Sequence, residues 1–182
     1  MQEDTGKFIE LLPDGEYLLS VMQREKHGFE KDRDILHLPV KKSKIEFMIK
    51  HMNFDASYYI HPNPRDPYKA SVKMNKALAN NYPNYVYLPK EFASAMASTS
   101  NREAIRWMVF DVDTEITVEQ FDTLGLLGEY HAIQTKHGYH LLFDTSVDHA
   151  KVRSTVTVDQ TANVMCPIPG TKQFDWTVKF LF

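Results

Sequence analysis

The sequence contains a single cysteine, Cys166, among 182 residues. One cysteine excludes an intramolecular disulfide and a cysteine-rich zinc site, and it favours a reducing, intracellular compartment. No apolar run approaches the roughly 18 residues of a membrane-spanning helix. The first residues are acidic and polar, which argues against a secretory signal peptide. We therefore expect a cytoplasmic protein with no membrane partner.

The chain also lacks a strong charge of either sign, since its formal net charge is −3. Any site for a polyanion must therefore be a local basic patch on a neutral-to-acidic body. Hydrophobic residues make up 43% of the sequence, and a chain of this length can bury a substantial core. The composition is that of a globular protein with one main domain.

The first forty residues predict an extension ahead of that domain. Two apolar runs flank Pro13-Asp14-Gly15, which is a turn signal, and they predict a hairpin. Residues 23–42 are mostly charged and predict a surface loop with a short strand. We assign residues 1–42 to an N-terminal extension packed on the core, and residues 43–182 to a single domain.

Helical and strand patterns alternate through the rest of the chain. Apolar spacing predicts helices at 43–52, with Ser43 as a possible N-cap, and at 68–82, 89–98, 117–127 and 146–154. Alternating or β-branched runs predict strands that start at 57 and lie at 85–89, 105–113, 129–135, 139–145, 155–159 and 174–182. This mixture predicts an α/β (α+β) fold with a partly antiparallel sheet.

Asp111 and Asp113 end the apolar strand "WMVFDVD". Residues i and i+2 of a strand project from one face, so two carboxylates would lie together at the end of a buried strand. Such a pair is costly unless a cation offsets it, and it suits Mg²⁺, which leaves positions open for phosphate oxygens. The structural alternative is that Asp113 or Thr114 caps the following helix.

The segment "QTKHGYHLLF" places Thr135, Lys136 and His140 around the turn between two predicted strands. A lysine and a histidine near two carboxylates would suit a metal-bound triphosphate. The alternative is a polar hairpin with a half-buried histidine. A third carboxylate would complete a two-metal site, and Asp159 and Asp175 are the candidates, although either is also consistent with a surface aspartate.

Arg65 follows a proline-rigid turn in "HPNPRDP", where it could bind phosphate or a template backbone. Lysines at 69, 73 and 76 share one face of the next predicted helix, and they could follow a nucleic-acid strand or simply form a solvated face.

Taken in order, these motifs resemble the archaeo-eukaryotic primase (primase-polymerase) superfamily, in its small phage and plasmid type. The matching segments are "HPNPRDP", "VFDVD", "TKHGYH", "TVD" at 157–159 and "CPIPGT", across about residues 57–175. The resemblance implies an RRM-like mixed or antiparallel sheet flanked by helices. It also implies template-dependent nucleotidyl transfer on single-stranded DNA, with Mg²⁺ or Mn²⁺ as cofactor and a separate helicase or replication complex as partner.

By residue, the resemblance implies metal ligation by Asp111, Asp113 and Asp159, with Asp175 as the alternative third ligand. It implies that His140 contacts the phosphates of the incoming nucleoside triphosphate, assisted by Thr135 or Lys136.

The sequence departs from the family pattern at several positions. Pro167 replaces a common arginine, and Gln173-Phe174-Asp175 replaces a common Asn-x-Lys, although Lys172 could supply one lost contact. Position 137 is histidine, where the family usually has a small residue.

Two rival hypotheses remain. The lost basic contacts favour a catalytically silent primase-like module that binds nucleic acid or a partner. The segment "FDVDTEIT" also resembles the D-x-D-G-T motif of haloacid-dehalogenase phosphatases, but Thr114 replaces its glycine and Glu115 its threonine.

Overall fold

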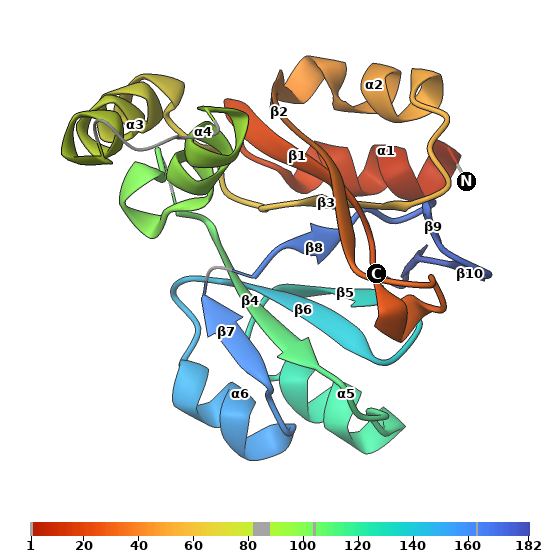
Figure 1. Cartoon of the computed structure of the whole chain (residues 1–182). Coiled ribbons are helices and arrows are strands. Elements are labelled where there is room, and N and C mark those ends of the chain that lie inside the picture. The colour runs from red at the N-terminus through yellow and green to blue at the C-terminus, as the bar shows by residue number, and fades with distance from the viewer. Residues whose placement is uncertain (1, 82–87, 104, 163) are drawn as a thin grey trace.

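The computed structural model describes residues 2–81, 88–103, 105–162 and 164–182. Two antiparallel sheets lie one above the other, with helices around them, so the predicted α+β class is confirmed (Figure 1). Between them, the two sheets create the space in which the candidate site lies.

The first sheet has the strand order β2-β1-β3-β8. Its strands are β1 (Glu16–Gln23), β2 (Arg33–Lys41), β3 (Ser57–Ile60) and β8 (Cys166–Pro167). The helices on this side are α1 (Gln2–Leu11), α2 (Ile45–His51), α3 (Pro67–Asn81) and α4 (Leu88–Ala97), with short 3-10 turns η1 (Glu25–His27), η2 (Lys42–Lys44) and η3 (Thr99–Asn101).

The second sheet has the strand order β11-β5-β6-β4-β7. Its strands are β4 (Trp107–Val112), β5 (Tyr130–Gln134), β6 (Tyr139–Asp144), β7 (Gln160–Ala162) and β11 (Lys179–Phe180). Helices α5 (Val118–Gly125) and α6 (His149–Thr155) lie below it in Figure 1. Strands β9 (Lys172–Gln173) and β10 (Trp176–Thr177) form a separate ribbon.

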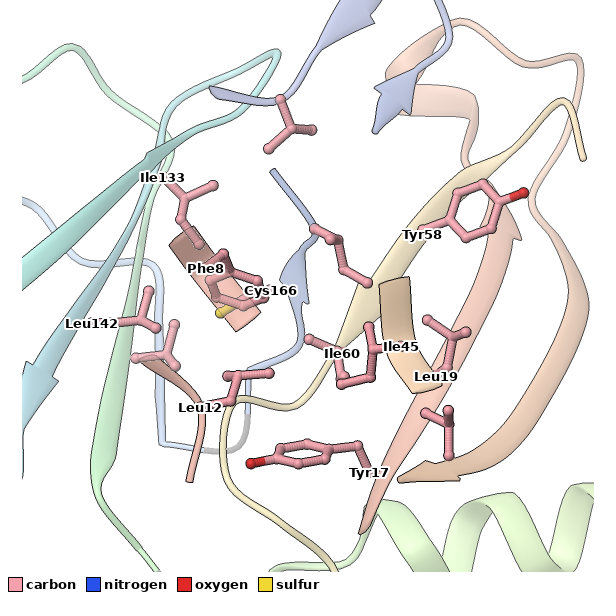
Figure 2. Close-up of a cluster of buried hydrophobic side chains, with 14 of the residues drawn as sticks. Phe8, Leu12, Tyr17, Leu19, Ile45, Tyr58, Ile60, Ile133, Leu142 and Cys166 are labelled. Atoms are coloured by element: carbon pink, nitrogen blue, oxygen red, sulfur yellow. The ribbon is translucent and has the colours of Figure 1, made fainter. Parts of the chain in front are cut away.

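One hydrophobic cluster joins the two sheets. Phe8 of α1 and Leu12, which directly follows α1, pack in the same cluster as Ile60 of the first sheet and Leu142 of the second, and Cys166 is buried among them (Figure 2). Burial of such large apolar side chains is the main stabilising term for this arrangement. The N-terminal helix is therefore part of the core that holds the sheets together.

The structure corrects three predictions in the N-terminal segment. The first arm of the expected hairpin is α1, in which Phe8 is buried, and Leu12, four residues further on and directly after the helix, is buried as well. The charged segment 23–42 contains the long strand β2, because pairing with β1 satisfies its backbone despite its polar composition. The helix predicted at 43–52 is confirmed, but Lys44 precedes it and no side chain caps it, so Ser43 is not its N-cap.

The expected boundary at residue 42 does not coincide with a break in the first sheet. Strand β1, from the expected extension, pairs with β2 and also with β3 of the expected domain. Hydrogen bonds across the sheet therefore bind residues on both sides of that boundary.

Other elements match or shift by a few residues. The hairpin of β5 and β6 is confirmed, with Gln134 opposite Tyr139. The strand predicted at 155–159 is wrong: residue 155 ends α6 and β7 begins at Gln160, where pairing with β4 starts. Most of the strand predicted at 85–89 lies outside the described residues, and Leu88 begins a helix. Helix α5 is capped by Thr117 in a capping box with Gln120, so neither Asp113 nor Thr114 is its cap.

Candidate active site between the two sheets

Alternation along β4 and β6 brings Asp111 and His140 to one face of the second sheet. Trp107 and Val109 precede Asp111 at two-residue intervals and are buried in the cluster that faces the first sheet. His140 is the Cα partner of Asp111 in the β4–β6 pairing, and its Nε2 atom lies 3.3 Å from Asp111 Oδ1. The apolar residues of β4 are therefore buried between the sheets, and the residues at its end place polar groups beyond that apolar cluster.

Asp159 joins this pair through the backbone. Its N–H donates to the carbonyl of Asp111 at 2.8 Å, and its Oδ2 atom accepts a hydrogen bond from the N–H of Asp113 at 2.9 Å. Asp175 instead accepts a hydrogen bond from the ammonium of Lys136 at 2.6 Å. Of the two alternatives for the third carboxylate, Asp159 is the one beside Asp111 and Asp113.

Burial and neighbouring charge disfavour ionisation of Asp111. Desolvation, followed by repulsion from Asp113, raises its pKa from 3.8 to about 6, while the charge of Lys26 opposes the rise. Burial lowers the pKa of His140 to about 3, with smaller contributions from Lys26 and His27. At neutral pH the neutral imidazole of His140 therefore faces the ionised carboxylate of Asp111, whose charged form is disfavoured by burial.

A cavity of about 520 Å³ opens in front of these residues and is lined from both sheets and from α4. Its lining combines apolar side chains, among them Leu18, Met22 and Val164, with polar and charged ones that come from opposite sides. The second sheet contributes Asp111, Asp113, Thr135, His137 and His140, and the first sheet, the turn after β1 and α4 contribute Ser20, Arg24, Lys26, His27, His37, Tyr59 and Lys90. A cavity with carboxylates on one wall and cations on the other suits a ligand whose own anionic groups would sit between them.

Of the hairpin residues predicted to bind phosphate, Thr135 and His140 line this cavity and Lys136 does not, and both Thr135 and Lys136 have partners within the protein. Thr135 is buried and its hydroxyl accepts hydrogen bonds from the N–H groups of His137 and Gly138, which shapes the turn. Lys136 donates to the carbonyl of His27 as well as to Asp175. The charge of Lys136 is therefore already matched within the protein.

Arg65 and Lys172 do not line this cavity. Arg65 is fully buried, and its guanidinium donates to the carbonyl of Ser98 at 2.9 Å. The turn that contains Arg65 contributes Asn63 instead, whose side chain hydrogen-bonds both the N–H and the carbonyl of Trp107 and so anchors β4. Lys172 is exposed and lines a second cavity beside α2.

Sequence reasoning missed the cavity residues that come from the first sheet. Arg24, Lys26 and His27 follow β1 in the segment that was expected to be mostly loop, and His61 follows β3. A signal was present in "REKHG", a cluster of cations and a histidine at the end of an apolar run. Only the pairing of β1 with β2 and β3 turns that cluster toward Asp111.

The fit to a divalent cation is partial. Asp111 and Asp113 are hard oxygen donors, and burial of Asp111, followed by repulsion from Asp113, holds the pKa of Asp111 above its ordinary value. Among residues 2–81, 88–103, 105–162 and 164–182, however, no three His, Cys, Asp or Glu side chains converge closely enough to hold a metal ion. As the side chains lie, the site offers a carboxylate pair, with the third carboxylate turned to the backbone of Asp113.

No protein-family model matches this sequence, and no curated protein or solved structure matches it either. Within the described residues, every helix is too short or too polar to cross a lipid bilayer. Function is therefore inferred from the site's own residues.

Proposed function

We propose that this protein is a template-dependent nucleotidyltransferase of the primase-polymerase type. The observation that carries the proposal is the contact between Asp111 and His140 on adjacent strands, next to Asp113 and Asp159, inside a cavity with cations on its far wall. The same residues form the motifs on which the resemblance to primase-polymerases rests.

In this proposal, Asp111 and Asp113 would hold Mg²⁺ or Mn²⁺, which supplies positive charge to neutralise a triphosphate and the developing charge at phosphorus. The protein's own part is positioning and charge, because a 3′-hydroxyl attacks the α-phosphate, pyrophosphate leaves, and no protein nucleophile is needed. His140 lines the cavity beside Asp111, and its buried Nδ1 atom has no hydrogen-bond partner among the described residues, so a contact with a phosphate oxygen would require the imidazole ring to turn.

Asp159 has a supporting role in this scheme. Its carboxylate fixes the backbone at Asp113 through the 2.9 Å hydrogen bond, and its negative charge adds to the demand for a cation. Single-stranded DNA as template, a separate helicase or replication complex as partner, an intracellular setting and a viral or plasmid origin belong to the same proposal.

The test is synthesis on a single-stranded DNA template with all nucleoside triphosphates and either Mg²⁺ or Mn²⁺. Labelled oligonucleotides should form with the wild type and be lost with Asp111→Asn, which retains the side chain's size. Asp122→Asn, an exposed aspartate of α5, is the matched control and should retain full activity.

Two other outcomes would redirect the assignment. Template binding without synthesis, unaffected by Asp111→Asn, would favour the catalytically silent module. Phosphate release from a simple phosphomonoester without template would favour the phosphatase.

A further inference from the structure

The turn that follows β1 brings cations to the cavity from the opposite sheet. Arg24 and Lys26 both line the cavity, and Arg24 lies 3.5 Å from Asp32 and 3.8 Å from Asp34. The ammonium of Lys26 has no carboxylate within 4.0 Å in the part of the chain that the structure describes. Among the described residues, Lys26 and Lys90 are the lining cations without a carboxylate partner, and Lys26 is the one whose charge acts on Asp111 and His140.

Electrostatics place Lys26 close to the candidate catalytic pair. Its charge opposes the rise in the pKa of Asp111, and it contributes to the lowered pKa of His140. Lys26 and the Asp111–His140 pair line the same cavity, Lys26 from the turn after β1 and the pair from the second sheet.

The tip of the β5–β6 hairpin holds the Lys26 turn in place. The Nε2 atom of His137 hydrogen-bonds the carbonyl of Lys26, and Lys136 donates to the carbonyl of His27 at 2.8 Å. The rings of His27 and His137 are stacked with their centroids 5.9 Å apart. Three contacts thus join a turn of the first sheet to a turn of the second.

Gly28 completes the turn, and no other residue would fit well. Its φ of +109° is a conformation that residues with a side chain rarely adopt, and an added Cβ would lie 2.9 Å from the ring of Phe174. Phe174 adjoins Asp175, which holds the ammonium of Lys136. The backbone that presents Lys26 is therefore fixed on both sides.

We propose that Lys26 binds the triphosphate of the incoming nucleotide, and that Lys136 and His137 are positioning residues that hold Lys26 over the carboxylates. This inference rests on the proposed function and deepens it. It differs from the assignment implied by the motif resemblance, in which Lys136 itself contacts phosphate.

The experiment measures binding of ATP and dATP in the presence of Mn²⁺ by titration calorimetry, with no turnover required. Lys26→Ala should weaken binding about 10- to 100-fold, the usual effect of losing a charged hydrogen bond, and Lys26→Arg should restore most of it. Lys31→Ala is the matched control, because Lys31 is exposed in the same connection and does not line the cavity.

A double-mutant cycle separates positioning from direct contact. If Lys136 acts through Lys26, Lys136→Ala should weaken binding in the wild type and have little further effect in the Lys26→Ala background. Additive losses would show that Lys136 contacts phosphate by itself and would overturn its positioning role.

The outcomes also distinguish this inference from the proposed function. If the wild type binds nucleotide and Asp111→Asn abolishes synthesis, but Lys26→Ala binds as the wild type does, the role of Lys26 is refuted and the proposed function stands. If the wild type binds no nucleotide and makes no product, both fail.

Discussion

Replacing Asp111 by asparagine tests the electrostatics of the site directly. The carboxyl has a pKa of about 6 in the folded protein, against an ordinary value of 3.8, mainly because it is buried and then because Asp113 is near. One pKa unit corresponds to about 1.36 kcal/mol, so ionised Asp111 destabilises the folded state by about 3 kcal/mol above pH 6. Asp111→Asn should therefore be more stable than the wild type at pH 7.5, by up to about 3 kcal/mol.

The pH dependence follows from the sign of the shift. Because the folded pKa lies above the unfolded one, the folded protein holds a proton between pH 3.8 and about 6, and its stability falls as pH rises through that range. The advantage of Asp111→Asn should accordingly shrink to less than about 1 kcal/mol at pH 4.

Urea unfolding followed by tryptophan fluorescence at pH 4 and pH 7.5 measures this difference. Asp122→Asn, at an exposed position of α5, is the control and should change stability by less than about 0.5 kcal/mol at either pH. If Asp111→Asn is instead less stable than the wild type at pH 7.5, Asp111 forms a favourable ion pair with protonated His140 across their 3.3 Å contact, and the electrostatic reasoning is refuted.

Three further predictions concern the frame of the site and its cation. Gly138→Ala should unfold more easily in urea and lose synthesis, because its Cβ would lie 2.0 Å from the carbonyl oxygen of Val112; Gly6→Ala, with open space around it, is the control. Thr117→Ala removes the capping box of α5 and should cost about 1 kcal/mol in the same assay. Mn²⁺ at 100 times its Kd should stabilise the wild type by about 2.7 kcal/mol in thermal melts, and should not stabilise Asp111→Asn.

Each of these has a clear opposite result. An active and fully stable Gly138→Ala protein would mean that the hairpin tip can move away from β4. Unchanged stability of Thr117→Ala would mean that water replaces the cap. Equal stabilisation of the wild type and Asp111→Asn by Mn²⁺ would place the cation elsewhere.

Local patterns in the sequence were enough to identify the strand that carries the site. The two-residue period that buries Trp107 and Val109 also sets the direction of Asp111, and the glycine turn at 138 predicts the β5–β6 hairpin that carries His140. The pairing of β6 with β4 then places His140 opposite Asp111. Periodicity and turn chemistry depend on neighbours a few residues apart, so they can be read before any fold is known.

Tertiary structure decided which distant groups meet there. Asp159 reaches Asp113 across 46 residues, and Lys136 reaches the carbonyl of His27 across 109. Such meetings depend on strand order and register, which the core imposes and which local patterns do not encode.

Because local patterns do not encode contacts between distant residues, the sequence also predicted the wrong cations at the site. The sequence predicted that Lys136 and Arg65 bind phosphate, because both are cations close to the candidate motifs. In the folded protein, Lys136 forms an ion pair with Asp175, and Arg65 is buried and donates to the carbonyl of Ser98. Lys26 lay in a segment whose charge predicted a loop, and pairing of β1 with β2 brought it to the cavity. The sequence by itself determined the carboxylate strand and its hairpin, and only the packing of one sheet on the other decided what faces them, because that packing depends on contacts between residues far apart in the chain.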